Sequence, residues 1–396
     1  MAPLLFLNRA SAKSSTVRLK AAGLNAIMSS IYSLKDFCMA LSIGIIGLSM
    51  SGRTTVFEAA TGAAAAARPG ETIHIGTAKV PDARIDKLSA MFKPIKTTFA
   101  EVKYLDLGAS VKNIGGEALR ELSAMDELVS VVRAFKDDSV PHPQLTVDAA
   151  RDIEAMNLEL TFSDLAIIER RLGKIEQSLK AAKAIDRPKI IAEQELLLRL
   201  KGELEKDIPL REVELTEEEE KSLAGYQFLS AKPLLTVVNI GEEDLSNVDK
   251  IEKDFAKKFS GNKRRLIALC GKLEAELATM DAASAAEFRS DYGLSETGLS
   301  RTIRASYALL NLISFFTAGP DECRAWSITA GTVAQVAAGK IHSDIQRGFI
   351  RAEIVAYDDF IRVGTMAEAK RQGILRLEGK TYVMKDGDIA QFLFNI

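Results

Sequence analysis

A glycine-bearing segment, residues 47–55, has the residue types of a phosphate-binding loop: Gly47-Leu48-Ser49-Met50-Ser51-Gly52-Arg53-Thr54-Thr55. It follows the apolar run Ile43–Ile46 and precedes helix-forming residues that begin near Val56. Glycines let backbone N–H groups converge on phosphate oxygens, and the N-terminus of the following helix adds its dipole. Thr54 occupies the hydroxyl position that would ligate Mg²⁺. The segment therefore predicts a loop that binds a nucleotide phosphate.

Arg53 departs from that motif, which has a lysine at this position. Arginine keeps the charge and can fork onto phosphate oxygens, but it is longer and planar, so the exchange is not conservative. Two interpretations follow. Either the loop binds nucleotide and hydrolyses it less efficiently, or it is a strand-to-helix turn that no longer binds nucleotide.

A second candidate is Asp106, which lies near the end of the apolar run Val102–Leu107. An aspartate at the end of a parallel strand beside a phosphate loop can hold Mg²⁺ through water. A glycine three residues later would offer its N–H to the γ-phosphate, but Ala109 holds that position and Gly108 comes one residue early. The alternative is a strand-end aspartate without a functional role.

A third candidate is Asn239-Ile240-Gly241-Glu242, at the end of the run Leu234–Val238. In related nucleotide switches an Asn–Lys–x–Asp sequence recognises guanine, the aspartate accepting from the ring N–H and amino groups. Glu242 is one methylene longer, so guanine selectivity is not expected and adenine becomes admissible. The alternative is a solvated acidic loop, since Glu242-Glu243-Asp244 is also a run of charge.

Five short apolar runs must position these residues. Near-continuous apolar runs separated by helical stretches indicate a parallel sheet that is covered on both faces. A helix is expected over Val56–Ala67, ending at Arg68-Pro69-Gly70. The expected strands are Leu41–Ile46, Val102–Leu107, Leu128–Val132, Pro233–Val238 and Leu266–Cys270.

A helical hairpin is expected between the third and fourth strands. The first helix has apolar residues at alternating steps of three and four, the pattern of a coiled-coil seam. Pro188 interrupts the pattern, and a second helix follows. The seam is Leu165, Ile168, Leu172, Ile175, Leu179 and Ala182, and the second stripe is Leu197, Leu200 and Leu204. Alternatively, the hairpin is a passive spacer or an oligomer contact. If it is an oligomer contact, the chain would form a dimer through this seam.

The C-terminal region is of a different kind. After a helical connection at Ser306–Leu312, short apolar runs alternate with glycine-containing turns, which predicts a small mixed β domain. The runs are Phe349–Val355, Ile374–Leu377, Tyr382–Met384 and Ile389–Phe394. His342 and Trp326, both in this region, are expected to be structural rather than catalytic.

Bulk properties narrow the class further. The 396 residues carry a formal net charge of −2, so there is no global attraction to nucleic acid or membrane. Cys38, Cys270 and Cys323 are too far apart for a disulfide framework or a zinc site, which favours a reducing compartment. No apolar run approaches the roughly 18 residues that span a bilayer. Residues 1–38 are basic and rich in serine, and are interpreted as an upstream extension or as an organelle transit peptide.

Several stretches carry a resemblance to a known family. In the C-terminal region they are Phe315-Phe316-Thr317-Ala318-Gly319-Pro320, Arg324-Ala325-Trp326, Ala337-Ala338-Gly339-Lys340-Ile341-His342-Ser343-Asp344, Arg347-Gly348-Phe349-Ile350-Arg351-Ala352-Glu353, Tyr357-Asp358-Asp359, and the ending from Gly387-Asp388 to Phe394-Asn395-Ile396. These stretches resemble the TGS domain of the Obg-like ATPase (YchF) family. The three candidate motifs occur in that family's order around a hairpin, so the resemblance covers essentially everything after Met39.

The resemblance implies roles for individual residues. It implies ATP with Mg²⁺ as the ligand (GTP being the alternative), slow hydrolysis and association with ribosomes. The loop Cys270-Gly271-Lys272-Leu273-Glu274 would close over the base edge. The implied phosphate contacts are Gly47, Ser49, Ser51, Gly52, Arg53, Thr54 and Thr55; the implied base contacts are Asn239, Glu242 and Gly271; the implied metal ligands are Thr54 and Asp106.

Three departures from the family pattern set the expected activity. Arg53 replaces the loop lysine, and Asp106-Leu107-Gly108-Ala109 lacks the family's Asp–Ile–Ala–Gly–Leu spacing. The segment Gly70–Thr77 keeps only Thr72-Ile73 of the family's Tyr–Pro–Phe–Cys–Thr–Ile. Since hydrolysis needs donors placed at the γ-phosphate, weak catalysis is expected, and no residue is assigned as catalytic.

The sequence thus predicts an α/β P-loop NTPase sheet with an inserted antiparallel helical hairpin and a C-terminal β-grasp-like TGS domain. The expected boundaries are 1–38 for the extension, 39–158 and 209–305 for the nucleotide-binding domain, 159–208 for the hairpin and 311–396 for the TGS domain. A cytoplasmic monomeric ATPase switch acting with the ribosome or ribosomal RNA, away from membranes, is the leading hypothesis. A non-hydrolysing module that binds nucleotide, RNA or the ribosome is the alternative.

Overall fold

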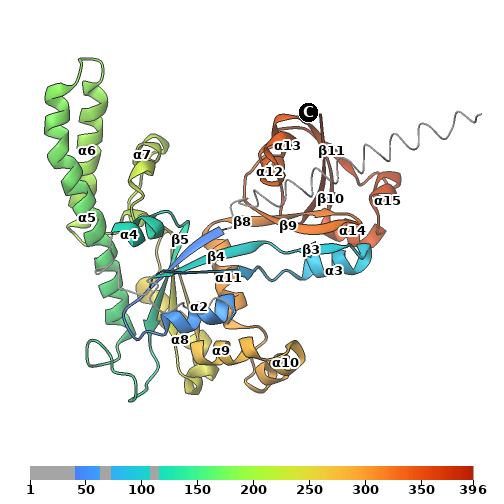
Figure 1. Cartoon of the computed structure of the whole chain (residues 1–396), viewed down its shortest axis with the longest axis horizontal. Helices are drawn as coiled ribbons and strands as arrows, with labels where there is room; N and C mark the ends of the chain where they lie inside the picture. The colour runs from blue at the N-terminus through green and yellow to red at the C-terminus, as the bar shows by residue number, and fades with distance from the viewer. Residues whose placement is uncertain (1–40, 63–72, 108–115, 396) are drawn as a thin grey trace, which may run out of the picture. The chain divides into compact units, whose positions relative to one another are not determined.

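The computed structural model describes residues 41–62, 73–107 and 116–395. The apolar runs predicted as strands form a six-stranded sheet with the order β2-β4-β1-β5-β6-β7 (Figure 1). Neighbouring strands are parallel, except that β2 pairs antiparallel with β4. The expected α/β class with a parallel sheet is confirmed. The strands are β1 (Leu41–Ile46), β2 (Ile73–Lys79), β4 (Glu101–Leu107), β5 (Glu127–Arg133), β6 (Leu234–Asn239) and β7 (Arg264–Leu269).

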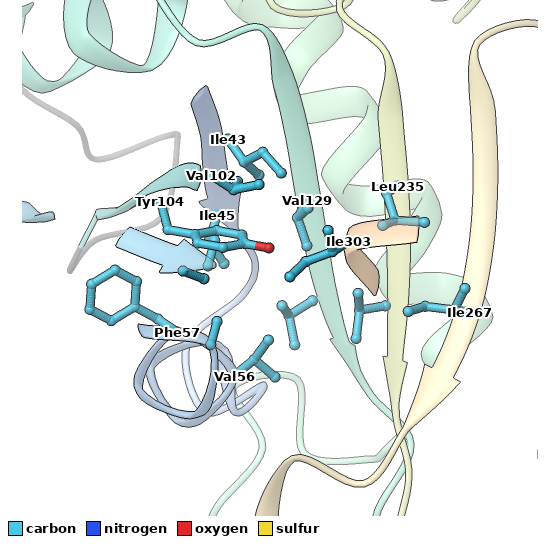
Figure 2. Close-up of a cluster of buried hydrophobic side chains, with 14 of the residues drawn as sticks. Ile43, Ile45, Val56, Phe57, Val102, Tyr104, Val129, Leu235, Ile267 and Ile303 are labelled. Atoms are coloured by element: carbon cyan, nitrogen blue, oxygen red, sulfur yellow. The ribbon is translucent and has the colours of Figure 1, made fainter. Parts of the chain in front are cut away.

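Helices cover both faces of this sheet, which is why its central strands are continuously apolar. On one face, α2 (Arg53–Thr61) and α11 (Gly298–Leu309) pack against β1, β4 and β5. Figure 2 shows Phe57 of α2 and Ile303 of α11 lying over Ile45 and Val129 of the sheet. The opposite face packs against α4 (Gly116–Ser123), α5 (Ala149–Ala181) and α8 (Val248–Phe259).

The predicted hairpin is formed by α5 and α6 (Arg187–Leu204), which lie side by side and antiparallel (Figure 1). The seam is used inside the hairpin, because Ile168 and Ile175 of α5 are buried with Leu197 and Leu200 of α6. Leu172 and Leu179 are partly buried in the same cluster.

Two details of the hairpin differ from the expectation. The first helix has 33 residues and begins at Ala149, before the expected start at 159, and the side chain of Asp148 caps it. Pro188 lies in the first turn of α6 and does not break a helix there. Proline is tolerated at that place because the missing N–H would have no acceptor in the helix.

The C-terminal region forms a second six-stranded sheet, with the order β11-β10-β12-β8-β9-β3. Its outermost strand, β3, comes from far earlier in the chain and pairs in parallel with β9. Helix α3 (Ala83–Phe92) buries Ile85 and Leu88 against Phe316 and Phe360 of this region. The strands are β3 (Lys96–Thr98), β8 (Leu312–Ala318), β9 (Glu322–Thr329), β10 (Phe349–Ala356), β11 (Arg376–Glu378) and β12 (Asp388–Phe394).

Several local predictions need correction. Tyr382–Met384 forms no strand; only Val383 makes an isolated bridge, to Val333. The helix after the phosphate loop begins at Arg53 and ends at Thr61, so it starts earlier and stops earlier than Val56–Ala67, and residues 63–72 lie outside the described part. The helical connection spans Gly298–Leu309, and Leu312 already belongs to β8.

The remaining elements connect these parts. They are η3 (Leu210–Glu212), α7 (Glu217–Leu223), η4 (Ala224–Tyr226), η5 (Glu242–Asn247), α9 (Gly271–Thr279), α10 (Ala282–Asp291), α12 (Ala334–Ile341), α13 (Ser343–Arg347), α14 (Tyr357–Val363) and α15 (Met366–Arg371). The described residues from Leu41 onward form one compact unit. The division into a nucleotide-binding domain, a hairpin and a TGS domain stays a prediction.

The structural roles expected for single residues of the second sheet are confirmed. Trp326 is buried and stacks on Phe315. His342 caps α13, its Nδ1 accepting from the backbone N–H of Asp344. Cys270 and Cys323 are buried free thiols. Among the described helices, none has both the length and the apolar character to cross a membrane.

Candidate functional site

The phosphate-loop candidate joins the end of β1 to the start of α2. Gly52 precedes α2 with a φ of 85°, no side chain caps the helix, and no acidic residue lies in its first turn. The first N–H groups of a helix have no intrahelical acceptors, and the helix dipole favours negative charge there. Met50, at φ 63°, is also left-handed and is 55% exposed. The loop thus has the form of an anion-binding turn.

Glycine is required at two places in this loop. A Cβ on Gly52 would lie 2.1 Å from Nδ2 of Asn239, and a Cβ on Gly47 would lie 2.5 Å from the carbonyl oxygen of Val131. The φ of Gly52 is also unfavourable for residues with a Cβ. Both glycines let the loop lie directly against β5 and β6.

The side chain of Arg53 turns inward and contacts Asp106. Its Nε lies 2.7 Å from Oδ1 of Asp106, and its Nη1 donates to the carbonyl oxygen of Gly47 at 3.2 Å. Asp106 is fully buried and Arg53 is 9% exposed. The sheet brings the pair together, because Asp106 of β4 lies beside Ile45 of β1, just before the loop. A buried charge of this kind needs a charged partner.

The second carboxylate oxygen of Asp106 also has neighbours. The hydroxyl of Thr54 donates to Oδ2 at 3.3 Å, and Nδ1 of His74 lies 3.5 Å from the same atom. His74 is directly opposite Asp106 in the register of β2 and β4. Thus the loop arginine, the loop threonine and a histidine of β2 all surround one buried carboxylate.

The Mg²⁺ site expected from Thr54 and Asp106 is only partly met by these donors. Thr54 lies at the expected place, and its hydroxyl has lone pairs for a metal. A carboxylate that holds Mg²⁺ through water needs an oxygen to accept from that water. In Asp106, Arg53 is at Oδ1, while Thr54 and His74 are at Oδ2. The described donor set therefore does not fit a divalent ion held at Asp106 in the usual way.

Asn239 links the two ends of the candidate site. Its Nδ2 donates to the carbonyl oxygen of Ser51 at 3.0 Å, and its Oδ1 accepts from the N–H of Gly271 at 2.9 Å. The side chain is 4% exposed. Because both atoms of the amide are used, the N-terminus of α9 (Gly271–Thr279) is fixed against the phosphate loop. The segment Cys270–Glu274, which was expected to be a loop, is therefore mostly the first turn of this helix. Gly271 is also close, since its added Cβ would lie 3.1 Å from the same amide oxygen.

Glu242 lies at the start of η5 and pairs with a lysine in the first turn of α9. Nζ of Lys272 lies 2.7 Å from Oε1 of Glu242, with side-chain exposures of 72% and 36%. The ion pair raises the pKa of Lys272. Burial raises the pKa of the neighbouring Cys270 thiol, so that group is held in its neutral form.

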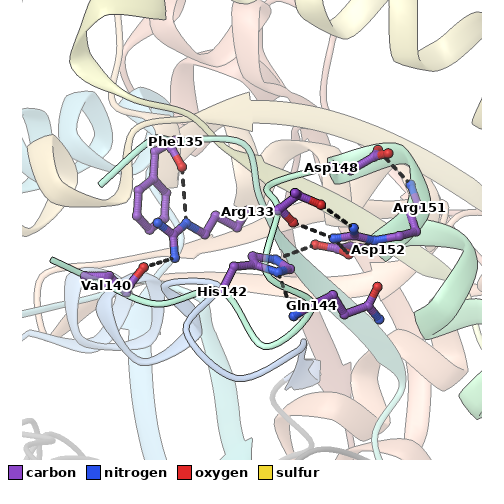
Figure 3. A network of polar contacts seen from close by, with 9 residues as sticks. Arg133, Phe135, Val140, His142, Gln144, Asp148, Arg151 and Asp152 are labelled. Carbon is purple, nitrogen blue, oxygen red and sulfur yellow. Dashed lines mark hydrogen bonds and ion pairs between the residues drawn. The ribbon is translucent and has the colours of Figure 1, made fainter. Parts of the chain in front are cut away.

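The loop that follows β5 lies beside the phosphate loop and has its own support (Figure 3). The guanidinium of Arg133, 2% exposed, donates to the carbonyl oxygens of Phe135 and Val140. It donates to the carbonyl oxygen of Asp137 as well. It also lies 4.4 Å from the centre of the Phe135 ring. That ring is half-buried, and its Cε1 would lie 3.8 Å from a Cβ on Gly52.

A second set of contacts holds the far end of the same loop (Figure 3). Nε2 of His142 lies 2.9 Å from Oδ2 of Asp152, and Nδ1 of His142 accepts from the N–H of Gln144. Arg151 binds Oδ1 of the same aspartate through two N–H groups. A loop fixed at both ends can present Phe135 as a rigid aromatic surface at the edge of the site.

The structure thus brings the predicted residues together at one edge of the sheet. Residues 47–55, Asp106, Asn239 and Gly271 are linked by direct contacts, and Glu242 adjoins them through Lys272. The predicted differences at Gly108, Ala109 and Thr72 lie outside the described residues. The binding roles of all these residues stay predictions.

Sequence reasoning missed His74, Arg133 and Phe135. His74 lies in the segment Gly70–Thr77, next to the retained Thr72-Ile73, but only strand pairing places it at Asp106. Arg133 ends an otherwise apolar run, which is the one signal that could have identified it. A charged residue at the end of a buried strand must bind something.

Comparisons with known proteins agree with this architecture. The family model YchF-GTPase_C, described as "Protein of unknown function (DUF933)", matches residues 312–395. Among solved structures, the YchF GTPase of Schizosaccharomyces pombe is similar, with a TM-score of 0.76 and 28% identity. That match covers 89% of this chain and 98% of the other.

Relatives of known sequence match over nearly their whole length. The chain is similar to the ribosome-binding ATPase YchF of Bacillus subtilis, with 40% identity over 374 residues, covering 90% of this chain and 100% of that protein. It is 37% identical over 371 residues to the protein of the same name from Escherichia coli O157:H7, with the same coverage. With this identity and coverage, a shared P-loop NTPase fold and the site geometry, the chain belongs to the YchF family.

Proposed function

We propose that this chain binds the phosphates of a purine nucleotide in the loop 47–55 and its base between Asn239, Gly271 and Phe135. The observation that carries the proposal is the pair of hydrogen bonds made by Asn239, one to the phosphate loop and one to the N-terminus of α9. A buried amide used in this way fixes the distance between a phosphate site and a base site. Phe135 supplies an aromatic surface for stacking at the same edge.

Adenine is the base that the site favours. Recognition of guanine needs a carboxylate that accepts from the ring N–H and the amino group. Glu242 is the nearest candidate, but its carboxylate is held by Lys272. Adenine has no such pair of donors to satisfy, so ATP is the proposed ligand and GTP is bound more weakly.

Hydrolysis is proposed to be slow. The reaction would be attack of water on the γ-phosphate in line with the bond to the leaving group. Arg53 and the amides of the loop would neutralise the phosphates, but Arg53 is engaged with Asp106 and Gly47. In this family the nucleotide is generally bound with Mg²⁺, which would neutralise charge between the phosphates. The contacts at Asp106 give that ion no usual place, so no step is assigned to it.

We propose that this chain associates with ribosomes and acts as a nucleotide-dependent switch in the cytoplasm. Relatives that are named ribosome-binding ATPases support the association with ribosomes. One described surface suits ribosomal RNA. A cavity of about 590 Å³ between α8, β7 and α11 is lined by Arg264, Arg265, Arg301 and Arg304. Three of these arginines pair with glutamates, while Arg265 is exposed. Arginine is suited to RNA phosphates because it binds them in a fork.

Isothermal titration with ATP and GTP tests the nucleotide proposal. We expect micromolar binding of ATP and at least about tenfold weaker binding of GTP, which is about 1.4 kcal/mol. Millimolar or absent binding of both nucleotides would reject the proposal. Co-sedimentation with ribosomes, with and without ATP, tests the association, and Arg265→Glu should weaken it without changing ATP affinity.

The second candidate function is a non-hydrolysing binding module, which is favoured by the Arg53–Asp106 contact. A single-turnover assay separates the two functions. Slow cleavage of bound ATP over minutes to hours supports the ATPase, and bound ATP that survives intact supports the module. We propose a monomer in either case, since the hairpin seam is already packed within the chain; light scattering measures this directly.

A further inference from the structure

The contacts of Asp106 carry a consequence for the ligand of this site. In a phosphate-binding loop with its usual lysine, the strand-end aspartate serves a divalent ion that accompanies the nucleotide. Here Asp106 already has a cation. Nε of Arg53 lies 2.7 Å from Oδ1, the pair is at most about a tenth exposed, and the Thr54 hydroxyl holds Oδ2 at 3.3 Å.

We propose that the Arg53 guanidinium replaces the divalent metal ion at Asp106, so that this chain binds nucleotide phosphates with little dependence on Mg²⁺. The inference rests on the proposed nucleotide-binding function and specifies the chemical form of the ligand: the metal-free nucleotide. It concerns the residue at which this chain departs from the phosphate-loop motif.

Two features make Arg53 suited to this role. A guanidinium stays protonated at every physiological pH, so the charge beside Asp106 is permanent. Its extended planar group can reach two acceptors at once: it forms an ion pair with Asp106, and its Nη1 donates to the carbonyl oxygen of Gly47. The second contact ties the guanidinium to the first residue of the loop.

The same geometry works against a metal ion. A water ligand of Mg²⁺ would have to displace Nε from Oδ1, because Thr54 and His74 already lie at Oδ2. A divalent ion would also be placed next to a fixed guanidinium in a site shielded from solvent, where like charges repel strongly. The shorter, single ammonium of a lysine can leave the carboxylate and move to the phosphates, which an arginine tied at two points does less readily.

The test is titration of ADP into the full-length protein in magnesium and, separately, in excess EDTA. ADP avoids hydrolysis, and affinity is a measure independent of activity. We expect the two dissociation constants to differ by less than about threefold. The variant Arg53→Lys should bind ADP at least about tenfold more tightly with magnesium than without it. Arg362→Lys, an exposed arginine paired with Asp359, is the matched control and should behave as the unaltered protein.

Electron paramagnetic resonance of Mn²⁺ gives a second measure. With ADP present, we expect the Arg53→Lys protein to retain protein-bound Mn²⁺ and the unaltered protein to leave it in solution. Binding of ADP by the unaltered protein that depends strongly on magnesium, or an Arg53→Lys protein with no greater dependence, would overturn the inference. Absence of ADP binding in both conditions would instead reject the nucleotide-binding function. Should Arg53→Lys fail to fold, the test rests on the unaltered protein alone, through the ratio of its ADP dissociation constants in magnesium and in EDTA.

Discussion

The two ends of the candidate site are built on different physical principles. At the base end, the neutral amide of Asn239 donates to Ser51 and accepts from Gly271, so every polar atom of that side chain is used. At the phosphate end, Arg53 and Asp106 form a buried ion pair with each other. In the usual loop these two positions would instead serve the phosphates and the metal ion of the ligand. The base end is therefore held by hydrogen bonds of a neutral side chain, whereas the phosphate end has an arginine in place of the usual lysine. The hydrogen bonds that hold the site together and the charges that face the ligand can thus vary independently within one fold.

The largest effect should come from breaking the ion pair. Asp106→Asn leaves the guanidinium of Arg53 without its buried counter-charge, and removing one partner of a buried pair typically costs about 3–5 kcal/mol. We expect the free energy of unfolding to fall by about 3 kcal/mol, measured by urea denaturation. Asp358→Asn, at an exposed position of the second sheet's region, is the control. A loss equal to that of the control would show that the pair adds nothing to stability.

The next effect should come from the base end. Asn239→Ala removes both hydrogen bonds that join the phosphate loop to α9, and each bond contributes about 0.5–1.5 kcal/mol. ATP affinity should fall by about 10- to 100-fold in isothermal titration. Asn247→Ala is the matched control, since Asn247 is an exposed asparagine whose side chain makes no capping bond. Unchanged ATP affinity in Asn239→Ala would contradict the claim that the Asn239 hydrogen bonds hold the two ends of the site in place.

Glu127 is a buried carboxyl outside the site, and changing it should alter the stability of the fold without altering ATP binding. Glu127 is fully buried; Ser306 donates to its Oε1, and burial raises its pKa from 4.5 to about 8. Between pH 4.5 and about pH 8, Glu127 therefore keeps its proton in the folded chain and loses it in the unfolded chain. The free energy of unfolding falls as the pH rises through that range. We expect a slope of on the order of 1 kcal/mol per pH unit, which Glu127→Gln should abolish.

The comparison is made by urea denaturation at several pH values. Glu101→Gln, an exposed residue of β4, should keep the slope of the unaltered protein. A slope that persists in Glu127→Gln would assign the pH dependence to another group. Because Glu127 does not belong to the site, ATP affinity should be the same in Glu127→Gln and the unaltered protein.

The smallest effect concerns base selectivity. Lys272→Ala releases the carboxylate of Glu242, which could then accept from guanine. Because the ion pair is exposed, we expect GTP affinity to rise by less than about fivefold while ATP affinity stays the same. Competition between labelled ATP and unlabelled GTP measures the ratio. An unchanged ratio of GTP affinity to ATP affinity would show that Glu242 has no part in choosing the base.

Much of the fold could be predicted because its central strands are buried on both faces. The run Leu41–Ile46 coincides with β1, and the other four runs lie within two residues of their strands. Strand β2 was not predicted, since it pairs on one side only and all but one of its residues are half-exposed or exposed. Strand β3 has three residues and depends on pairing with β9, a contact across more than 200 positions that no local pattern encodes.

The residues of the candidate site could be predicted from the sequence, but the contacts between their side chains could not. Glycines, an arginine, an aspartate and an asparagine at strand ends could be identified from spacing alone. That Arg53 turns inward to Asp106 depends on a side-chain conformation and on the alignment of β1 with β4. The same holds for Phe135, whose position depends on three carbonyl contacts of a neighbouring arginine.

The central claim is that residues 47–55 bind nucleotide phosphates through their backbone. A crystal structure with ADP tests it most directly. The account predicts phosphate oxygens within about 3.2 Å of backbone nitrogens in the loop and the first turn of α2. It also predicts that Asn239 keeps its bonds to Ser51 and Gly271. A loop closed on itself, with ADP absent or bound elsewhere on the chain, would contradict the account.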